Sequence, residues 1–327
     1  MLNPLSDFER NVRDLQAHID ELRNIAAKKG DGDAQVVNAA LENLVSQTTH
    51  LRSRRYANLT TWERVQVARH PERPHTLDYV DMIFSDWVEL HGDRRFADDP
   101  AMVCGLARLN GRSVAIIGQQ KGRDTKKRIH RNYAMPHPEG YRKALRVMEL
   151  AQRFHLPIVA FVDTPGAYPG IASEERGIAE AIAVNLREMA VMDVPILAIV
   201  IGEGGSGGAL GIAVADRVLM LENSWYCVIS PEGCASILWR TPEMAPAAAE
   251  ALQLAAPQLE KIGVIDEIIP EPAGGAHANW KEMAAAIRDR LQAHLDELLE
   301  LSGAELVQRR IERFSSVGVW HEKEKSS

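Results

Sequence analysis

VPILAIVIGEGGSGGAL, residues 194–210, runs from a continuously apolar, β-branched segment into a turn in which five of seven residues are glycine. Short apolar segments of this kind are typical of strands that are buried on both faces of a parallel sheet. The same pattern occurs upstream in LPIVAFVDTPGAYPG, residues 156–170, and in a shorter form at 216–240. Helical periodicity at 141–154 and 174–192 precedes the two longer copies. The sequence therefore predicts an α/β fold of repeated strand, turn and helix units.

A strand hairpin is expected just before these units. Residues 101–109 and 112–119 are strand-like and are joined by Asn110-Gly111. This dipeptide favours a tight hairpin because both positions tolerate positive φ. The sheet is therefore expected to begin near residue 101.

The first ninety residues have helical periodicity instead. Apolar residues recur every three or four positions between 8 and 25 and again between 37 and 51, on either side of a polar KKGDGD segment. This spacing places them on one face of each helix. We expect an N-terminal helical hairpin that forms an arm over residues 1–57, with further helices at 61–69 and 76–90.

The C-terminal part returns to helical periodicity. An apolar strand is expected in KIGVIDEIIP at 261–270, followed by long amphipathic helices over about 279–314. Ser302 and Glu305 have the spacing of a capping box, which indicates a helix start. We expect residues 58–327 to form the main domain, with these C-terminal helices as its tail.

The composition excludes several classes of protein. Hydrophobic residues make up 46% and charged residues 25% of the chain, as in ordinary globular proteins. The 38 basic and 45 acidic residues give a net charge of −7, which disfavours a nucleic-acid partner. The three cysteines have no CxxC spacing, so we expect no metal in this chain. MLNPLSDFER does not resemble a secretory signal and no eighteen-residue apolar run occurs, so the expected protein is cytoplasmic and has no membrane segment.

The glycine-rich segment at 202–208 is the first candidate site. Backbone N–H groups at a helix start are unpaired, and glycine lets an oxygen approach them without interference from a Cβ atom. The turn is therefore a candidate oxyanion hole. The expected donors are the N–H groups of Gly204, Gly205, Gly207 and Gly208.

The turn at 163–170, DTPGAYPG, is the second candidate. It follows a comparable strand, so we expect the two turns to face a shared crevice and to offer two sets of donors. A reaction in which negative charge develops on two oxygens needs two such sets. The residues that we assign to this second set are Gly166, Ala167, Tyr168, Gly170 and Ile171.

The segment at 202–208 also fits a dinucleotide-binding template. Gly202, Gly204 and Gly207 match GxGxxG, and Glu222 lies where an acceptor for the ribose is expected. However, only about nine residues separate Gly207 from the next expected strand at Arg217. That is short for a crossover helix, which disfavours this template.

A serine hydrolase is the other alternative. Gly204, Ser206 and Gly208 match GxSxG. Candidate triad partners follow Ser206 along the chain, namely Asp216, Asp266 and His277. In an oxyanion hole, by contrast, Ser206 would be only a small polar side chain beside the substrate.

The segment at 121–131 is strongly basic. Its six cations are a weak candidate for contact with a nucleic acid or another anion: Lys121, Arg123, Lys126, Lys127, Arg128 and Arg131. The alternative is a solvated helix face. Histidines have no ligand spacing such as HxxxH, and we expect structural roles for them.

Four long blocks of sequence carry a resemblance to a known family. They are GQQKGRDTKKRIHRNYAMPHPEGYRKALR at 118–146, FVDTPGAYPGIASEERGIAEAIAVNLREM at 161–189, VIGEGGSGGAL at 200–210 and VISPEGCASILWR at 228–240. In this order they resemble the α subunits of bacterial acetyl-CoA carboxylase carboxyltransferases. The resemblance implies a crotonase-type (ClpP/crotonase) superhelix of repeated ββα units.

The resemblance also implies a reaction. In this family carboxybiotin, held on the biotin carboxyl carrier protein, gives its carboxyl group to acetyl-CoA, which yields malonyl-CoA in the first committed step of fatty acid biosynthesis. The α subunit is active only with a β subunit that bears a zinc ribbon, in an assembly expected to be α2β2, and biotin carboxylase recharges the carrier. The first glycine turn then supplies oxyanion donors, and the second turn with Ser206 contacts biotin or substrate. The anion that the basic segment at 121–131 would contact is then the phosphate groups of CoA.

Overall fold

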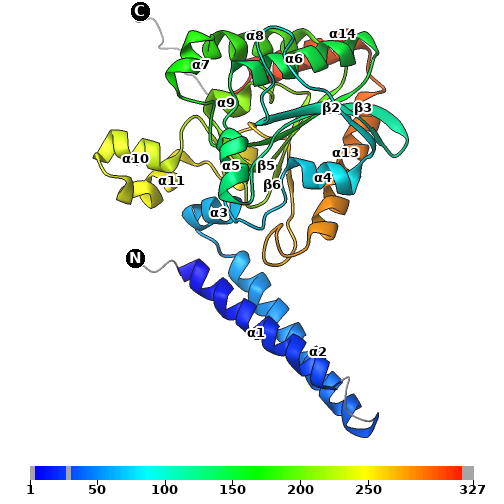
Figure 1. Cartoon of the computed structure of the whole chain (residues 1–327), viewed down its shortest axis with the longest axis vertical. Coiled ribbons are helices and arrows are strands. Elements are labelled where there is room, and N and C mark those ends of the chain that lie inside the picture. Colours follow the sequence, from blue (N-terminus) through cyan, green and yellow to red (C-terminus); the bar gives the residue numbers. More distant parts are fainter. Residues whose placement is uncertain (1–3, 27–30, 319–327) are drawn as a thin grey trace, which may run out of the picture.

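The computed structural model of the chain describes residues 4–26 and 31–318, which form a mixed sheet flanked by helices with a long helical arm (Figure 1). The strands run in the order β1-β2-β3-β4-β5-β6-β8, and β7 pairs with the end of β5. The pairs β1-β2 and β2-β3 are antiparallel, and all other pairs are parallel. The strands are β1 (Ser85–Glu89), β2 (Met102–Leu109), β3 (Arg112–Gln119), β4 (Ile158–Thr164), β5 (Ile196–Gly205), β6 (Arg217–Leu221), β7 (Trp225–Cys227) and β8 (Glu267–Ile269).

Helices follow most of the strands, as the repeated pattern predicts. α5 to α8 lie between β3 and β5, and α9 joins β5 to β6. The helices are α1 (Pro4–Ala26), α2 (Asp31–Tyr56), α3 (Thr61–Ala68), α4 (Thr76–Ile83), α5 (Thr125–His130), α6 (Pro138–Arg153), α7 (Ile171–Glu175), α8 (Ile178–Val191), α9 (Ser206–Leu210), α10 (Pro231–Trp239), α11 (Ala245–Leu252), α12 (Ala256–Lys261), α13 (Trp280–Leu298) and α14 (Gly303–Ser315), with 3-10 turns η1 (Asn132–Ala134) and η2 (Pro242–Met244). Among the helices of the described ranges, none combines the length and the apolar character needed to cross a bilayer.

The continuous apolar runs are explained by burial on both faces of the sheet. Alternate residues of β4 pack on opposite sides: Ile158 and Ala160 lie with α6 and α8, whereas Val159 and Phe161 lie with α4 and α13. Figure 1 shows these helix pairs on the two sides of the sheet. Strands covered in this way need no polar face, as predicted.

The strand hairpin is confirmed, but one helix is shorter than expected. Asn110 and Gly111 have φ of 48° and 86° and join β2 to β3. The helix expected at 76–90 ends at Ile83, and β1 takes up residues 85–89. β1 is an irregular edge strand with a register shift, which is why it has no strand periodicity.

The N-terminal helices form the expected hairpin, which projects from the body in Figure 1. The KKGDGD segment is only partly described: α2 already begins at Asp31, and residues 27–30 lie outside the described residues. At the base of the arm Leu5, Tyr56 and Val67 are buried in one cluster. The division of the chain at residue 57 stays a prediction.

A buried ion pair between Arg310 of α14 and Asp216, which precedes β6, holds the C-terminal helix in place. The guanidinium of Arg310 donates to both oxygens of Asp216 at 2.9 and 2.8 Å, and also to the carbonyl oxygens of Met189, Met192 and Val194. Arg310 is only 1% exposed. A buried ion pair is tolerated when its remaining polar atoms are bonded in this way.

The start of α14 has the predicted capping box. Ser302 Oγ accepts from the Glu305 N–H at 3.3 Å, and Glu305 Oε2 accepts from the Ser302 N–H at 2.8 Å. We expect Ser302→Ala to lower the free energy of unfolding by about 1 kcal/mol, because the cap is lost. Urea unfolding followed by circular dichroism measures this. Ser315→Ala, on the exposed last turn of the same helix, is the control and should change stability by less than about 0.5 kcal/mol.

Candidate active site

The two glycine turns meet at the carboxyl ends of neighbouring parallel strands. Thr164 at the end of β4 pairs with Gly204 near the end of β5. A Cβ atom on Gly205 would overlap the carbonyl of Pro165, and one on Gly208 would overlap the backbone of Gly166 and Ala167. Glycine is therefore needed at 205 and 208 because the two turns pack directly against each other.

The first turn presents its donors at the start of α9. Ser206 is exposed and holds the left-handed position of the turn, with φ of 57°, whereas Gly205 has φ of −92°. The first N–H groups of a helix have no intrahelical partner. Gly207 is half-buried, and a Cβ atom there would meet Ile182 only at 3.8 Å. Of the four glycines predicted as donors, Gly207 is thus the accessible one, because Gly204, Gly205 and Gly208 are buried.

The second turn has fewer free donors than expected. The Gly166 N–H donates to Thr164 Oγ1 at 3.1 Å, and the Tyr168 N–H donates to the Pro136 carbonyl at 3.0 Å. The Tyr168 ring lies over Gly170, the N-cap residue of α7, and Ile171 is exposed. At Gly166 and Tyr168 the turn therefore shapes the site without offering an amide to a ligand.

A buried ionic network lies directly beside the turns. Lys121 Nζ is 2.6 Å from Asp163 Oδ1 and 2.9 Å from Glu203 Oε2, and its side chain is only 17% exposed. Arg69 Nε donates to Glu203 Oε1 at 2.6 Å. The Glu203 N–H in turn donates to Asp163 Oδ1 at 3.0 Å. Lys121, which follows β3, and Arg69, which follows α3, thus neutralise the carboxylates near the ends of β4 and β5.

These contacts set the protonation of the network. Burial opposes the charge of Lys121, but Asp163 and Glu203 outweigh this effect and raise the pKa of Lys121. Burial likewise opposes the charge of Glu203, but Lys121 and Arg69 lower its pKa. Burial raises the pKa of Asp163 in spite of Lys121. The ammonium therefore stays charged between its carboxylate partners.

A cavity of about 270 Å³ opens beside this network. Arg69, Lys121, Asp163 and Glu203 line it, together with Pro165 of the second turn. His75 also faces the cavity, and burial with Lys121 and Arg123 nearby lowers its pKa to about 3, which leaves the imidazole neutral. The cavity is therefore polar, and basic side chains outnumber acidic ones in its lining, which also includes Arg73 and Arg128. It lies beside the two turns.

The basic segment does not form one exposed surface, because three of its six cations are engaged within the fold, and its contact with an anion stays a prediction. Lys121 is held in the buried network. Arg123 is bonded to Asp78 and lies over the Trp280 ring. Arg131 donates to the Pro100 carbonyl at 2.7 Å. The cations exposed on α5 are Lys126, Lys127 and Arg128.

The hydrolase triad is not assembled. Asp216 is engaged by Arg310, and Asp266 is engaged by Arg313 at 2.9 Å. His277 stacks on His70, with ring centroids 3.7 Å apart. Each proposed partner of Ser206 is thus occupied elsewhere in the fold, and the serine hydrolase has no support.

The dinucleotide-binding template fails because the segment after Gly207 is too short for a crossover helix. α9 has only five residues and ends before β6 begins at Arg217, so there is no full crossover helix. Glu222 lies beside Arg64, with the charged atoms 3.7 Å apart.

Two side chains that support the first turn were not predicted. Gln119 donates to the Gly208 carbonyl at 3.2 Å and accepts from the Asp163 N–H at 3.0 Å, so it bridges the ends of β4 and β5. Tyr141 Oη also donates to the Gly208 carbonyl, at 3.0 Å. Both contacts join segments far apart in the chain, and no local pattern signals them.

Comparison with known proteins identifies the family. The sequence matches the model of the family described as acetyl co-enzyme A carboxylase carboxyltransferase-like over residues 5–318. The acetyl-coenzyme A carboxylase carboxyl transferase subunit alpha of Geobacter metallireducens is 56% identical over 308 residues, which cover 94% of this chain and 95% of the relative. The same subunit of Syntrophotalea carbinolica is 53% identical over 312 residues, which cover 95% and 97%.

Solved structures show the same fold at much lower identity. Transcarboxylase 12S has a TM-score of 0.55 and 19% identity, and the match covers 78% of this chain and 44% of that longer chain. A Pseudomonas malonate decarboxylase hetero-tetramer has a TM-score of 0.55 and 18% identity, and the match covers 68% and 89%. The crotonase-type fold is thereby confirmed. Since identity to the curated relatives exceeds one half over nearly the full length of both chains, this chain belongs to the family of acetyl-CoA carboxylase carboxyltransferase α subunits.

Proposed function

We propose that the chain supplies the biotin-facing half of a carboxyltransferase that converts acetyl-CoA to malonyl-CoA. The observation that carries this proposal is the junction of the two glycine turns, where the start of α9 leaves the half-buried Gly207 open beside the exposed Ser206. Carboxybiotin supplies the transferable carboxyl group when its carrier protein delivers it. The residues that would hold its ring are those of the α9 turn and the Ala167–Ile171 side of the second turn.

The chain's own contribution is electrostatic. The N–H groups at the start of α9 donate to an oxygen on which negative charge develops, and one well-placed donor lowers a barrier of this kind by about 3 kcal/mol. The packing of Gly205 and Gly208 against the second turn fixes the direction of these donors. The neutralised Lys121 network keeps the neighbouring carboxylates from opposing that charge.

The partner that we propose is a zinc-ribbon β subunit, which supplies the acetyl-CoA side in an α2β2 assembly. An exposed apolar surface around α10 supports this proposal, since apolar patches of this kind are typical of interaction sites. In Figure 1 α10 and α11 project from the body. The exposed side chains are Val228, Ile237, Leu238, Trp239 and Met244. The biotin carboxyl carrier protein and biotin carboxylase complete the proposed system.

Reconstitution tests this function. The full chain is copurified with a β subunit, and malonyl-CoA is measured with acetyl-CoA and carboxylated carrier protein. We expect activity from the pair and none from the chain alone. A pair that copurifies as a folded complex and still forms no malonyl-CoA would refute the proposal.

Ser206 should be dispensable for this reaction. Because it is exposed and its proposed triad partners are engaged elsewhere, we expect Ser206→Ala to change kcat of the reconstituted pair by less than about threefold. Ser206→Gly, which suits the left-handed backbone, is the matched control. Labelling of Ser206 by a fluorophosphonate, or loss of turnover in both variants, would instead support a nucleophilic serine.

A further inference from the structure

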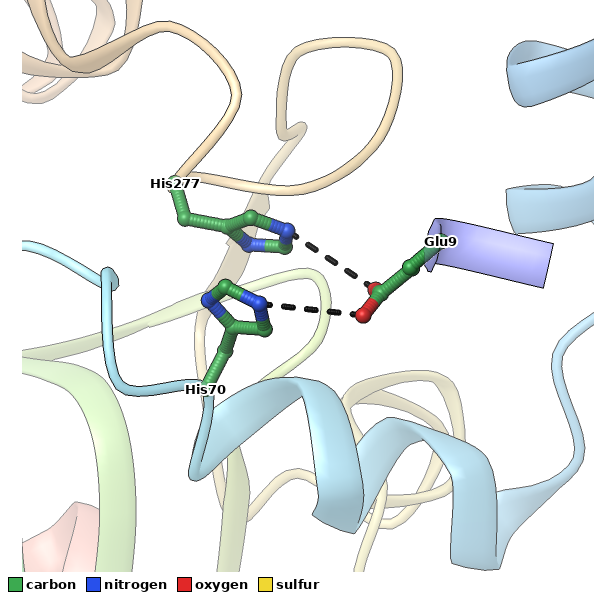
Figure 2. Close-up of side chains that lie close together, drawn as sticks. All are labelled: Glu9, His70 and His277. Carbon is green, nitrogen blue, oxygen red and sulfur yellow. Dashed lines mark ion pairs between the residues drawn. The ribbon is translucent and has the colours of Figure 1, made fainter. Parts of the chain in front are cut away.

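Three metal-ligating side chains converge where the arm meets the body. Glu9 comes from α1, His70 from the loop after α3, and His277 from the loop between β8 and α13. Figure 2 shows both imidazole rings with a nitrogen turned toward the Glu9 carboxylate. His70 Nε2 is 3.7 Å from Glu9 Oε2, and His277 Nε2 is 3.8 Å from Glu9 Oε1.

The three polar groups are shielded but do not bond to one another. The side chains of His277, His70 and Glu9 are 6%, 10% and 18% exposed. Separations of 3.7 and 3.8 Å exceed hydrogen-bonding distance. His277 Nδ1 is buried and has no hydrogen-bond partner within the described residues. Shielded nitrogens that face a carboxylate across such a gap leave their coordinating capacity unused.

We propose that Glu9, His70 and His277 form a site for a divalent transition-metal ion, with Zn²⁺ the best match to two imidazoles and one carboxylate. In a tetrahedral Zn²⁺ site with bonds of about 2.0–2.1 Å, the ligand atoms lie roughly 3.3 Å apart. The two separations between histidine and Glu9 need to close by about half an ångström, and all three ligand atoms already lie within 4.8 Å of one another. The stacked rings must also splay so that both lone pairs point at one ion.

Neighbouring groups bond to two of the proposed ligands, and an adjoining cavity could hold a fourth ligand. Tyr56 Oη donates to Glu9 Oε1, which orients the carboxylate as a neighbouring group commonly does in metal sites. The Glu72 N–H donates to His70 Nδ1 at 3.2 Å, so the neutral imidazole carries its proton on Nε2. When Nε2 coordinates the ion, this proton leaves Nε2 and Nδ1 becomes the protonated nitrogen, so the hydrogen bond from Glu72 is lost. A cavity of about 170 Å³ adjoins the three ligands and leaves room for water as a fourth ligand.

Occupation of this site would fasten the arm to the body. Glu9 belongs to the arm, whereas His70 also lines the 270 Å³ cavity beside the ionic network. Arg13 and Arg52 border the smaller cavity, so a bound ion must offset their positive charge. An anionic fourth ligand such as hydroxide would suit these guanidinium groups.

Zinc titration of the full chain tests the site without any assay of carboxyl transfer. After treatment with a chelator, isothermal titration calorimetry with Zn²⁺ should show one ion per chain. We expect His70→Ala, His277→Ala and Glu9→Gln each to weaken binding by at least about tenfold. His155→Ala, which alters an exposed histidine beyond the end of α6, is the matched control and should bind as the parent does.

Two further measurements keep the test decisive if an alanine variant folds poorly. Glu9→Gln retains an acceptor for Tyr56, and His277→Gln approximates the volume of the imidazole, so both should keep the fold. Zn²⁺ should raise Tm of the parent and of His155→Ala but not of these two variants. Co²⁺ should give the visible absorption of a tetrahedral site in the parent and in His155→Ala, but not in Glu9→Gln or His277→Gln. Absence of saturable binding in the parent, or equal binding in Glu9→Gln and His277→Gln, would overturn the proposal.

Discussion

Lys121→Met is expected to lower the free energy of unfolding by about 3–5 kcal/mol, because it removes the cation that lies between Asp163 and Glu203. Methionine has nearly the length of lysine, so the change removes charge more than volume. The two carboxylates are almost fully buried and would face each other with only Arg69 as a counter-charge on Glu203. Urea unfolding followed by circular dichroism measures the loss.

The same segment provides the control for this experiment. Lys126 is exposed on α5, and Lys126→Met should change stability by less than about 0.5 kcal/mol. Adding Asp163→Asn to Lys121→Met should recover part of the lost stability, since one of the unpaired charges is gone. A loss below about 1 kcal/mol for Lys121→Met would show that the network is not held together by its ammonium.

Gly205→Ala is expected to lower kcat/KM for malonyl-CoA formation by the reconstituted pair at least about a hundredfold, which corresponds to about 2.7 kcal/mol. The added Cβ atom overlaps the Pro165 carbonyl and forces the two turns apart. The donors at the start of α9 are then misdirected relative to the second turn. Initial rates over a range of acetyl-CoA concentrations give kcat and KM separately.

Gly207→Ala is the matched control for the steric effect. Its Cβ atom would meet only Ile182 at ordinary contact distance, so the fold and the association with the β subunit should be unchanged. Any loss of turnover in this variant reports on access to the α9 donors rather than on packing of the turns. Full activity of Gly205→Ala would show that the junction of the turns is not part of the active site.

The elements that can be predicted from the sequence are those whose signal lies within one short segment. The apolar runs at β4 and β5 identify strands because both faces of these strands are buried, and Asn110-Gly111 identifies the hairpin because its backbone needs positive φ. β1 escaped prediction because it lies at the edge, pairs irregularly and follows a genuine helix without a break in composition.

The candidate site was predictable only where one segment carries the signal. The glycine turns are contiguous, but the partners of Lys121 lie at the ends of two other strands, and only the sheet order brings them together. For the same reason the basic segment looks like one surface in the sequence, although its first residue, Lys121, follows the end of β3 and is paired with Asp163. Histidine spacing likewise could not indicate His70 and His277, which meet Glu9 through tertiary contact alone.

The pairing of Asp216 with Arg310 has a consequence for how the chain matures on the ribosome. The two residues are 94 positions apart, and Arg310 lies on the last helix of the described chain. Since synthesis proceeds from the N terminus, β5 and β6 leave the ribosome well before the cation that neutralises Asp216. Until α14 emerges, that carboxylate lacks its cation and must stay hydrated. Completion of this part of the core therefore waits for the synthesis of α14.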